Sequence, residues 1–501
     1  MSAERAVDAL MKTLAGEGIT FDDVTLAPRY ADFLPQDAGI ATRLTRNVSL
    51  NIPFVSAAMD TVTESRMAIA MARLGGIGVI HKNLDVVRQS HEVEIVKNYL
   101  NGLIRNPVTF RASDTLRFVQ ETRKSKGYTF SGFPVLDDAG CVAGILTSFD
   151  MKFVSDMSAK VGDVMVREVV TAPAETSLIQ AYELMQKHRI GKLPLVAGGR
   201  LVGLYSYTDV KTLVENAEPQ FNRDSKHRLR VAASVGTNDH ERVEALAAKD
   251  VDVIVIDTAH GHTRGVIEMC RWIKGRFPGI DVIAGNIVTG EAALALRDAG
   301  ADAVKVGIGP GSICTTRVVA GVGIPQITAV YDVASALKGS LPVISDGGIR
   351  YSGDVPKAIV AGADCVMMGA ALAGTDESPG EKIIFQGRQY VTYRGMGSLA
   401  AMKGFAGSRD RYNQADVDEE DLVPQGVEGI IPFAGTVEKV MSQFCGGLGV
   451  SLGYCGCRTL RELQDNGRFV RITSAAVREA HPHDVRIMKD APNYSVNAPG
   501  G

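Results

Sequence analysis

Short runs rich in valine and isoleucine recur along the 501-residue chain, and helical patterns separate them. Alternation of this kind is typical of parallel βαβ units. Eight runs are expected to be strands: 52–59, 76–81, 228–236, 251–260, 281–286, 303–309, 341–348 and 364–370. Eight such units predict an α/β fold of the (β/α)8 TIM barrel type, for which about 250 residues is typical. A doubly wound open sheet is the alternative.

An inserted segment interrupts this alternation after the second strand, and it contains an internal repeat. "GILTSFD" (144–150) recurs as "GLYSYTD" (203–209). Duplicated units of this size normally pack on each other and bury a shared face. We therefore expect the first part of the barrel at 1–99, an inserted domain at 100–215, and the second part of the barrel at 216–501.

The repeat resembles a tandem pair of CBS domains. In that family a Ser/Thr-x-x-Asp end often holds an adenine or guanine nucleotide, and here it reads Thr147 with Asp150 and Ser206 with Asp209. The alternative is a structural insertion in which these residues cap helices. Both interpretations stay open at this point.

Composition limits the partners. The formal net charge of −3 and the pI near 6.3 give no global basic field, so neither nucleic acid nor an anionic membrane is expected as a partner. The stretch "MSAERAVDALMKTLAGEG" carries charges where a signal peptide needs an apolar core. No run of about 18 uncharged apolar residues occurs. We expect a cytoplasmic protein.

One of the seven cysteines is the candidate nucleophile. The odd, scattered set argues against a disulfide framework. Cys314 follows a strand end and three loop glycines, Gly307, Gly309 and Gly311, where a core residue is unexpected. A thiolate is a nucleophile, and we expect loop N–H groups and Arg317 to favour the thiolate form.

The loops after the seventh and eighth strands are candidate phosphate sites. They read "SDGG" (345–348) and "MGA" (368–370), and in barrels these two loops commonly hold a phosphate against backbone N–H groups. Turn geometry alone explains either glycine loop, but the two together favour phosphate. Asp346 is placed to accept hydrogen bonds from ribose hydroxyls, so we expect a nucleotide.

A dinucleotide cofactor, if one binds, is expected across the mouth of the barrel. No Rossmann glycine fingerprint follows a strand. Asp257 and Asn286, at the ends of the fourth and fifth strands, are candidates to contact it or the base. For Asp257 the alternative is an N-cap of the following helix. "HGH" (260–262) and "HPH" (481–483) lack partners at zinc spacing, so no zinc site is predicted.

Several motifs together resemble the bacterial IMP dehydrogenases that carry a CBS insertion. They are "GPGSICTTRVVAGVGIPQ", "SDGGIRYSGD", "GTDESPGE", "YRGMGSLAAM", "GSRDRY" and "HPHDV", and the likeness runs from residue 18 to residue 496. The resemblance implies oxidation of IMP to XMP with NAD+, the committed step toward guanine nucleotides.

The same resemblance implies roles for individual residues. Cys314 would attack C2 of the hypoxanthine and form a covalent thioimidate, and Arg411 and Tyr412 of a mobile flap would then activate water. A second proton relay would pass through Thr316. The residues implied to bind IMP are Ser312, Asp346, Gly348, Gly369, Ala370, Tyr393, Gly395, Met396, Gly397 and Gln425. Those implied to face NAD+ are Asp257, Asn286, Gly307 and Gly309.

A potassium ion and a homotetramer are also implied. Carbonyls of Gly309, Gly311 and Cys314 would bind K+, and those of Glu479, Ala480 and His481 from a neighbouring subunit would complete the site. Whether tetramers pair into octamers stays open.

Two departures from the family pattern stand in this sequence. Gln425 replaces a glutamate found in many bacterial members, which puts the relay through Thr316 in doubt. Ala480 replaces a common serine, with little expected effect because the carbonyl is the ligand.

Two other functions compete. GMP reductase shares the cysteine loop but uses NADPH to convert GMP to IMP, and its family lacks the Arg-Tyr flap, so "GSRDRY" (407–412) favours the dehydrogenase. A nucleotide-sensing binding protein built on the CBS pair is the third interpretation.

Overall fold

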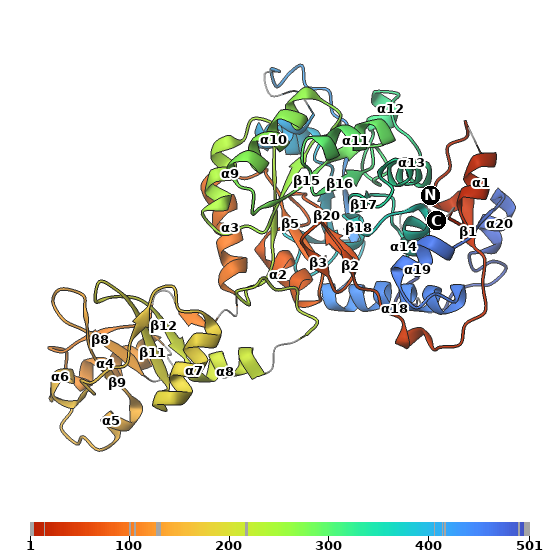
Figure 1. The fold of residues 1–501 in the computed structure, drawn as a ribbon. Helices are drawn as coiled ribbons and strands as arrows, with labels where there is room; N and C mark the ends of the chain where they lie inside the picture. The colour runs from red at the N-terminus through yellow and green to blue at the C-terminus, as the bar shows by residue number, and fades with distance from the viewer. Residues whose placement is uncertain are drawn as a thin grey trace. The chain divides into compact units, whose positions relative to one another are not determined.

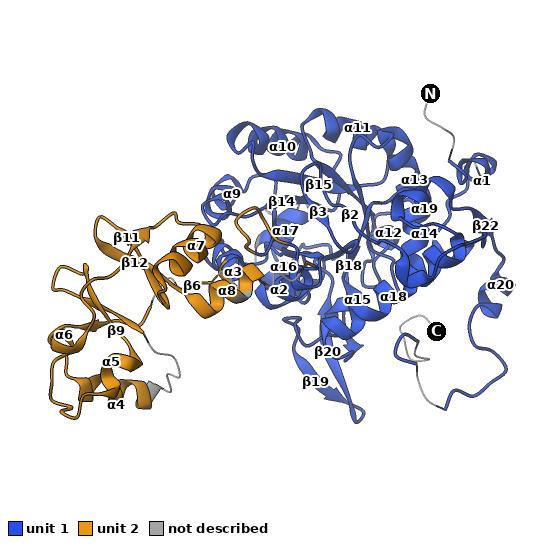
Figure 2. Cartoon of the chain, turned by 60° about the horizontal axis from the view of Figure 1, so that its bottom comes forward, with its two compact units in different colours: residues 1–97, 220–222, 229–501 blue, residues 98–219, 223–228 orange. Residues whose placement is uncertain are grey.

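The computed structural model describes residues 5–14, 16–99, 102–104, 107–126, 132–215, 219–404, 406–412, 414, 417–488 and 491–494. It divides into two compact units, coloured separately in Figure 2. The barrel unit comprises Met1–Lys97, Gln220–Asn222 and Leu229–Gly501, and the insertion unit comprises Asn98–Pro219 and Arg223–Arg228.

Eight parallel strands close into a barrel in the first unit (Figure 1). Their order around the barrel is β13-β14-β15-β16-β17-β18-β4-β5, and β5 pairs with β13 to close it. The doubly wound alternative is therefore wrong, because an open sheet has two unpaired edges. The strands are β4 (Phe54–Ser56), β5 (Ile77–Ile80), β13 (Ala232–Val235), β14 (Val253–Asp257), β15 (Asp281–Ile287), β16 (Ala303–Val306), β17 (Val343–Asp346) and β18 (Cys365–Met368).

The valine and isoleucine runs form strands because both of their faces are covered. Almost every strand residue of the barrel is buried, since one face packs on the barrel interior and the other on the helices. Inward residues such as Val55, Val255 and Ile344 form one hydrophobic cluster. The surrounding helices are α2 (Ser65–Arg73), α3 (Val86–Asn98), α9 (His240–Ala247), α10 (Arg264–Arg276), α11 (Gly290–Asp298), α13 (Gln326–Leu337), α14 (Asp354–Ala361) and α15 (Ala370–Ala373).

Additional segments decorate the barrel. A three-stranded antiparallel sheet contains β19, β20 and β21, and β1 pairs with β22. These elements are β1 (Val24–Leu26), β19 (Lys382–Phe385), β20 (Arg388–Arg394), α16 (Leu399–Gly404), α17 (Ala406–Arg411), β21 (Glu428–Pro432), α18 (Val437–Cys455), α19 (Leu460–Asn466), β22 (Phe469–Arg471) and α20 (Ser474–Glu479). Helices α16 and α17 are called the flap below.

The insertion unit repeats one arrangement twice. Each half has a strand parallel to the first strand of an antiparallel hairpin, with a helix between them and another helix after the hairpin. The first half has β7 (Phe110–Arg111), α4 (Leu116–Lys126), β8 (Phe133–Leu136), β9 (Val142–Leu146) and α5 (Ser148–Lys152). The second half has β10 (Ala172–Pro173), α7 (Leu178–His188), β11 (Lys192–Ala197), β12 (Arg200–Ser206) and α8 (Tyr207–Glu215).

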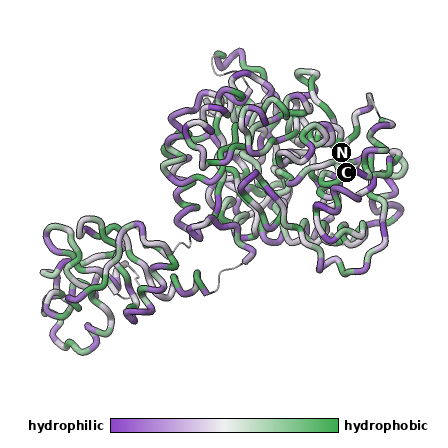
Figure 3. The backbone as a smooth tube through the Cα atoms, viewed as in Figure 1, coloured by the Kyte–Doolittle hydropathy of each residue, from purple (hydrophilic) through white to green (hydrophobic). Residues whose placement is uncertain are grey.

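Each half of the insertion unit has its own hydrophobic cluster, and hydrophobic stretches occur in both units of the chain (Figure 3). Thr147 caps α5 in a capping box with Asp150, whose Oδ2 accepts hydrogen bonds from Thr147 N and Oγ1, both at 2.7 Å. The helix-capping interpretation therefore holds for the first repeat, and it is compatible with ligand binding nearby.

Within the described residues, no helix has the length and apolar character needed to span a bilayer. The same residues contain no group of three or more His, Cys, Asp or Glu side chains arranged to hold a metal ion.

Candidate active site

The cysteine loop follows β16 and is tied to a second segment of the barrel mouth. Thr315 N donates to the carbonyl of Gln425 at 3.1 Å, and Val427 N donates to the carbonyl of Ile313 at 3.0 Å. Cys314 Sγ lies 3.1 Å from Thr316 Oγ1 and 3.7 Å from the carbonyl oxygen of Gln425. The thiol is thus held between the predicted relay residue and the backbone of Gln425.

Three other cysteines differ from Cys314 in their surroundings. Burial raises the pKa of Cys270 and of Cys445 to about 12, and that of Cys457 to about 11. Cys314 is half-buried and lines a cavity. A thiolate is costly in an apolar surrounding, so these three thiols are poor nucleophiles.

Arg317 braces the loop backbone. Its Nε donates to the carbonyl of Ile308 at 2.8 Å, and its NH2 group donates to the carbonyl of Ile324 at 2.7 Å. Burial lowers the pKa of Arg317, and a charge interaction with Cys314 opposes this shift, so the guanidinium is near enough to act on the thiol as expected while its hydrogen bonds go to the loop backbone. Charged donors make strong bonds to backbone carbonyls, so Arg317 holds the curvature of the loop.

The predicted residues largely gather around one cavity of about 360 Å³, a volume within the range of small-ligand sites. Of the predicted residues, those that line it are Asp257, Asn286, Gly307, Gly309, Gly311, Ser312, Cys314, Asp346, Gly348, Gly369, Ala370, Tyr393, Gly395, Met396, Arg411, Tyr412 and Gln425.

Five predicted residues lie outside that lining. Thr316 reaches the site through Cys314 Sγ. Gly397 packs under the ring of Tyr412, where a Cβ would lie only 2.6 Å from the ring carbon Cζ. Glu479, Ala480 and His481 lie at the end of α20, and His481 Nδ1 is 3.0 Å from Tyr494 Oη. Among the described residues, none of these three lines the cavity that contains Cys314.

The ends of β17 and β18 form a small polar pocket at one side of the cavity. Gly348 has φ of +83°, a conformation that favours glycine. A Cβ at Gly369 would lie 2.8 Å from Tyr393 Oη, so glycine leaves room for the tyrosine hydroxyl. Burial raises the pKa of Tyr393, which keeps its hydroxyl protonated as a donor. These features suit an anion bound by N–H and O–H donors.

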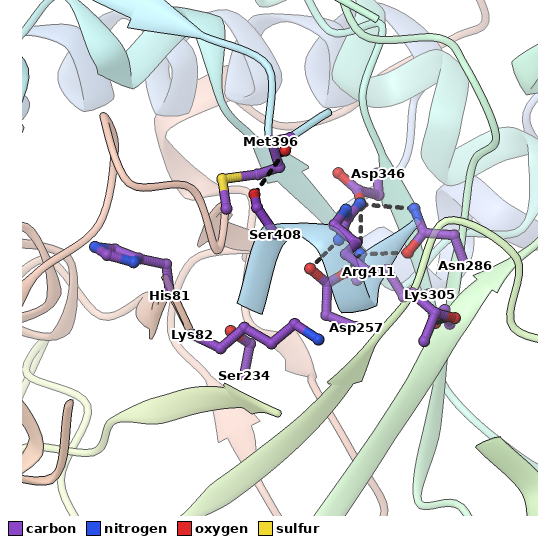
Figure 4. Close-up of polar contacts among 12 residues, drawn as sticks. His81, Lys82, Ser234, Asp257, Asn286, Lys305, Asp346, Met396, Ser408 and Arg411 are labelled. Carbon is purple, nitrogen blue, oxygen red and sulfur yellow. Dashed lines mark hydrogen bonds and ion pairs between the residues drawn. The ribbon is translucent and has the colours of Figure 1, made fainter. Parts of the chain in front are cut away.

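A buried lysine that sequence reasoning missed organises the other side of the cavity. Lys305 is 1% exposed, and its Nζ lies 2.9 Å from Asp257 Oδ1 and 2.6 Å from Asp346 Oδ2. Nζ also donates to Asn286 Oδ1, while Asn286 Nδ2 donates to the carbonyl of Gly307 at 2.7 Å and to Asp346 Oδ2 at 2.9 Å. These side chains come from β14, β15, β16 and β17, and Figure 4 shows them pointing toward one another. The available signal was a single charge within the apolar run "AVKVG".

Asp257 is therefore not a helix cap. The following helix, α10, is capped by Thr263, whose Oγ1 accepts from Val266 N at 3.4 Å. The carboxylate of Asp257 instead binds Lys305 and, through Oδ2, NH1 of Arg411. The N-cap alternative is wrong because the strand ends several residues before the helix begins.

The flap is docked in the cavity. Ser408 Oγ donates to the carbonyl of Met396 at 2.6 Å (Figure 4). Ala259 N donates to the carbonyl of Arg411 at 2.9 Å. Burial raises the pKa of Tyr412, and the adjacent Arg411 opposes this shift. Nε of Arg411 is buried without a hydrogen-bond partner among the described residues. Buried donors are normally satisfied, so this nitrogen has capacity for a water or a ligand atom.

Comparison with known proteins agrees with this site. The family described as "IMP dehydrogenase / GMP reductase domain" matches residues 18–483. An inosine-5'-monophosphate dehydrogenase of Halalkalibacterium halodurans is 51% identical over 485 residues, covering 96% of this chain and 98% of the relative. One of Aquifex aeolicus is 50% identical over 488 residues, covering 96% and 98% respectively. The solved structure of a GMP reductase from Trypanosoma brucei, in complex with guanosine 5'-monophosphate, superposes with a TM-score of 0.80. It is 38% identical and covers 95% of this chain and 100% of that one.

Proposed function

Because the chain belongs to the IMP dehydrogenase / GMP reductase family, we propose that its barrel oxidises IMP to XMP with NAD+ through the thiol of Cys314. The chain is an oxidoreductase that acts on IMP, because the curated relatives named above are inosine-5'-monophosphate dehydrogenases. They are about 50% identical to this chain over nearly its whole length. The GMP reductase neighbour is more distant, at 38%. The docked Arg411 and Tyr412 favour a reaction that ends in hydrolysis, which the reductase does not need.

The oxidation step uses Cys314 as the nucleophile. Its sulfur adds to C2 of the hypoxanthine ring and loses its proton. The hydrogen on C2 then leaves as a hydride, with its electron pair. The double bond between C2 and the ring nitrogen forms again, and the product is a thioimidate covalently bound to Cys314. Bound NAD+ supplies the hydride acceptor. The half-buried thiol, 3.1 Å from Thr316 Oγ1 within a cavity, supports this assignment.

IMP would lie along the cavity with its phosphate at the ends of β17 and β18. Ser312, Gly348, Gly369 and Tyr393 would hold the phosphate, with Ala370 beside it. Asp346 would accept from the ribose, because Lys305 and Asn286 both bind its Oδ2 and so fix the carboxylate. Gly395, Met396, Gly397 and Gln425 would contact the base.

The hydrolysis step uses the flap. Water attacks C2 of the thioimidate, and the sulfur of Cys314 leaves as the thiolate. Arg411 and Tyr412 would orient and deprotonate that water. An isolated guanidinium stays protonated, and Arg411 binds the carboxylate of Asp257 in this docked form, so removal of the water proton would require that contact to open or another group to accept the proton. A relay through Thr316 would be weakened here, because the side-chain amide of Gln425 does not take up and release a proton as a glutamate carboxylate would.

The residues at the mouth fit NAD+ only when the flap is out. Asp257, Asn286, Gly307 and Gly309 line the cavity and would face the cofactor. With the flap docked, the guanidinium of Arg411 binds the carboxylate of Asp257. Nε of Arg411 is buried without a hydrogen-bond partner among the described residues and would be able to bind the attacking water. The flap and NAD+ would therefore use the site in turn.

Potassium suits the donor chemistry of the cysteine loop. Carbonyl oxygens are ligands for alkali ions, and Gly309 has a positive φ of +79° that turns the loop back on itself. Carbonyls of Gly309, Gly311 and Cys314 would hold the ion. Glu479, Ala480 and His481 are far along the chain and would complete the site from a neighbouring subunit of a homotetramer.

The insertion unit would bind a regulatory nucleotide as a CBS pair. It contains a cavity of about 950 Å³ whose lining includes Thr147, Lys192, Ser206, Tyr207 and Asp209. Adenine or guanine nucleotides fit this combination of apolar walls and hydroxyls with two acidic side chains, Glu168 and Asp209, and one basic side chain, Lys192. We place this regulated enzyme in the cytoplasm, with IMP and XMP as its ligands in the barrel.

A direct assay tests the proposal. Purified protein mixed with IMP, NAD+ and K+ should form NADH, measured by absorbance, and XMP, measured by chromatography, in equal amounts. Formation of IMP from GMP and NADPH, with no XMP from IMP, would instead support the reductase. Binding of nucleotides without either turnover would support the sensor.

A further inference from the structure

A buried ion pair joins the flap to the barrel next to the site. Lys82 follows β5, and only 3% of its side chain is exposed. Its Nζ lies 2.5 Å from Oδ2 of Asp410, the residue before Arg411. Figure 4 shows Lys82 apart from the group of side chains around Lys305. Neither Lys82 nor Asp410 is among the described residues that line the cavity.

Two glycines make room for this contact. A Cβ at Gly236, at the end of β13, would lie 2.7 Å from Lys82 Nζ and would overlap the carboxylate of Asp410. A Cβ at Gly407, within α17, would lie 2.5 Å from the carbonyl oxygen of Lys82. Both distances are shorter than real Cβ contacts. The flap helix and the ion pair therefore pack directly on backbone at this point.

The charge of Lys82 is balanced mainly by the flap. Burial lowers the pKa of Lys82, and Asp410 opposes this through its charge and its hydrogen bond. Asp239 contributes in the same direction more weakly, while Arg411 lowers the pKa further. Removing Asp410 from this position deprives a buried cation of its nearest counter-ion, which is strongly unfavourable. Flap docking and charge compensation of Lys82 are therefore coupled.

Two neighbouring flap residues carry opposite charges, and each binds a barrel residue of the other charge. Asp410 binds Lys82 after β5, and Arg411 binds Asp257 at the end of β14. Strand β13 lies between these two strands in the barrel. A flap shifted by one residue would place like charges together, and like charges in contact are disfavoured. The pair thus selects one docked register.

We propose that Lys82 and Asp410 are positioning residues that latch the flap and set how often Arg411 and Tyr412 occupy the site. The proposal rests on the function given above, in which the flap and NAD+ alternate. A ligand that binds only when the flap is out has an apparent Kd equal to its intrinsic Kd divided by the fraction of molecules with the flap out. Weakening the latch should therefore slow hydrolysis and tighten dinucleotide binding.

The variant Asp410→Asn tests the latch, because it removes the charge and keeps the shape. In rapid mixing with IMP and NAD+, the first-turnover NADH formation should stay within about twofold of wild type, whereas hydrolysis of the Cys314 adduct should slow by about tenfold. At equilibrium, tetrahydronicotinamide adenine dinucleotide, which cannot accept a hydride, should bind the IMP complex about tenfold more tightly. Asp418→Asn removes an exposed charge downstream and should change neither.

Lys82→Met provides a second, independent arm. It should slow hydrolysis as Asp410→Asn does, and the double variant should be no slower than either single variant, because both remove one shared interaction. Unchanged adduct hydrolysis in Asp410→Asn would overturn the latch, and so would equal slowing of both half-reactions or weaker dinucleotide binding. Absence of NADH from wild type would instead overturn the proposed function itself.

Discussion

The barrel and the insertion unit bury polar groups in different ways. The cavity of the barrel is about 360 Å³ and is bordered by Lys305, Asp257 and Asp346 in one connected network. The cavity of the insertion unit is about 950 Å³, and its lining is mostly apolar, with several hydroxyls and the charged side chains of Glu168, Lys192 and Asp209. Connected, buried charges fix reacting groups in place, whereas a roomy apolar cavity serves binding. This difference supports the proposal that the barrel carries the chemistry and that the insertion unit binds a regulatory ligand.

Replacing the thiol should have the largest effect. Cys314→Ala should abolish both the NADH burst and the adduct, because loss of a covalent nucleophile costs on the order of a million-fold in kcat in other enzymes. Stopped-flow absorbance and intact mass spectrometry provide the measurement. Cys141→Ala, in the insertion unit, is the matched control and should retain turnover. A residual NADH burst in Cys314→Ala would show that another residue is the nucleophile.

Removing the buried lysine should be the next largest effect. Lys305→Gln leaves two carboxylates without their shared cation, so the free energy of unfolding should fall by about 3 kcal/mol, and kcat/KM by at least about a hundredfold. Denaturant titration and steady-state assays measure these. Lys187→Gln, on the exposed face of α7 in the insertion unit, should alter neither. Equal effects of Lys305→Gln and Lys187→Gln would contradict the distinction between the barrel and the insertion unit.

Exchange of the monovalent ion should have an intermediate effect. Li+ in place of K+ should slow turnover by at least about tenfold, since misplacing a reacting group by 1 Å costs about a hundredfold. Initial rates in matched chloride salts provide the measurement. Rates that are indifferent to the cation would remove the potassium assignment and leave the thiol chemistry standing.

Deleting the insertion should have the smallest effect on chemistry. A variant lacking residues 100–215, rejoined by a short linker, should keep turnover within about tenfold of wild type, a difference of about 1.4 kcal/mol in the barrier. Complete inactivity of a folded, tetrameric deletion variant would contradict the division of roles.

The regulatory ligand should act only when the insertion is present. Adenine or guanine nucleotides at about a hundred times their Kd should stabilise the intact chain by about 2.7 kcal/mol, measured as a rise in Tm. The deletion variant should show no such rise. An equal rise in both proteins would place the nucleotide in the barrel.

The sequence predicted the scaffold well, because the barrel strands are short, mostly apolar runs buried on both faces. It also singled out Cys314, since glycines around a thiol after a strand are visible locally. Both predictions rest on residues that are close together in the sequence.

The sequence could not show which polar groups meet across the barrel. Lys305 was missed because a charge in an apolar run gives no direction, and Asp257 was weighed as a helix cap because its partners lie 48 and 154 residues away. Lys82 and Asp410 are separated by 328 residues. Such contacts follow from barrel closure and flap docking, which no local pattern encodes.

The Arg411→Ala variant, mixed rapidly with IMP and NAD+, tests the two-step account most directly. If Cys314 serves hydride transfer and Arg411 serves hydrolysis, NADH should form in a burst at about the wild-type rate. Turnover should then stall by about a hundred- to ten-thousand-fold, the usual cost of losing a general base, with a nucleotide adduct on Cys314 visible by intact mass spectrometry. Loss of the burst itself, or hydrolysis of the adduct at the wild-type rate, would contradict the account.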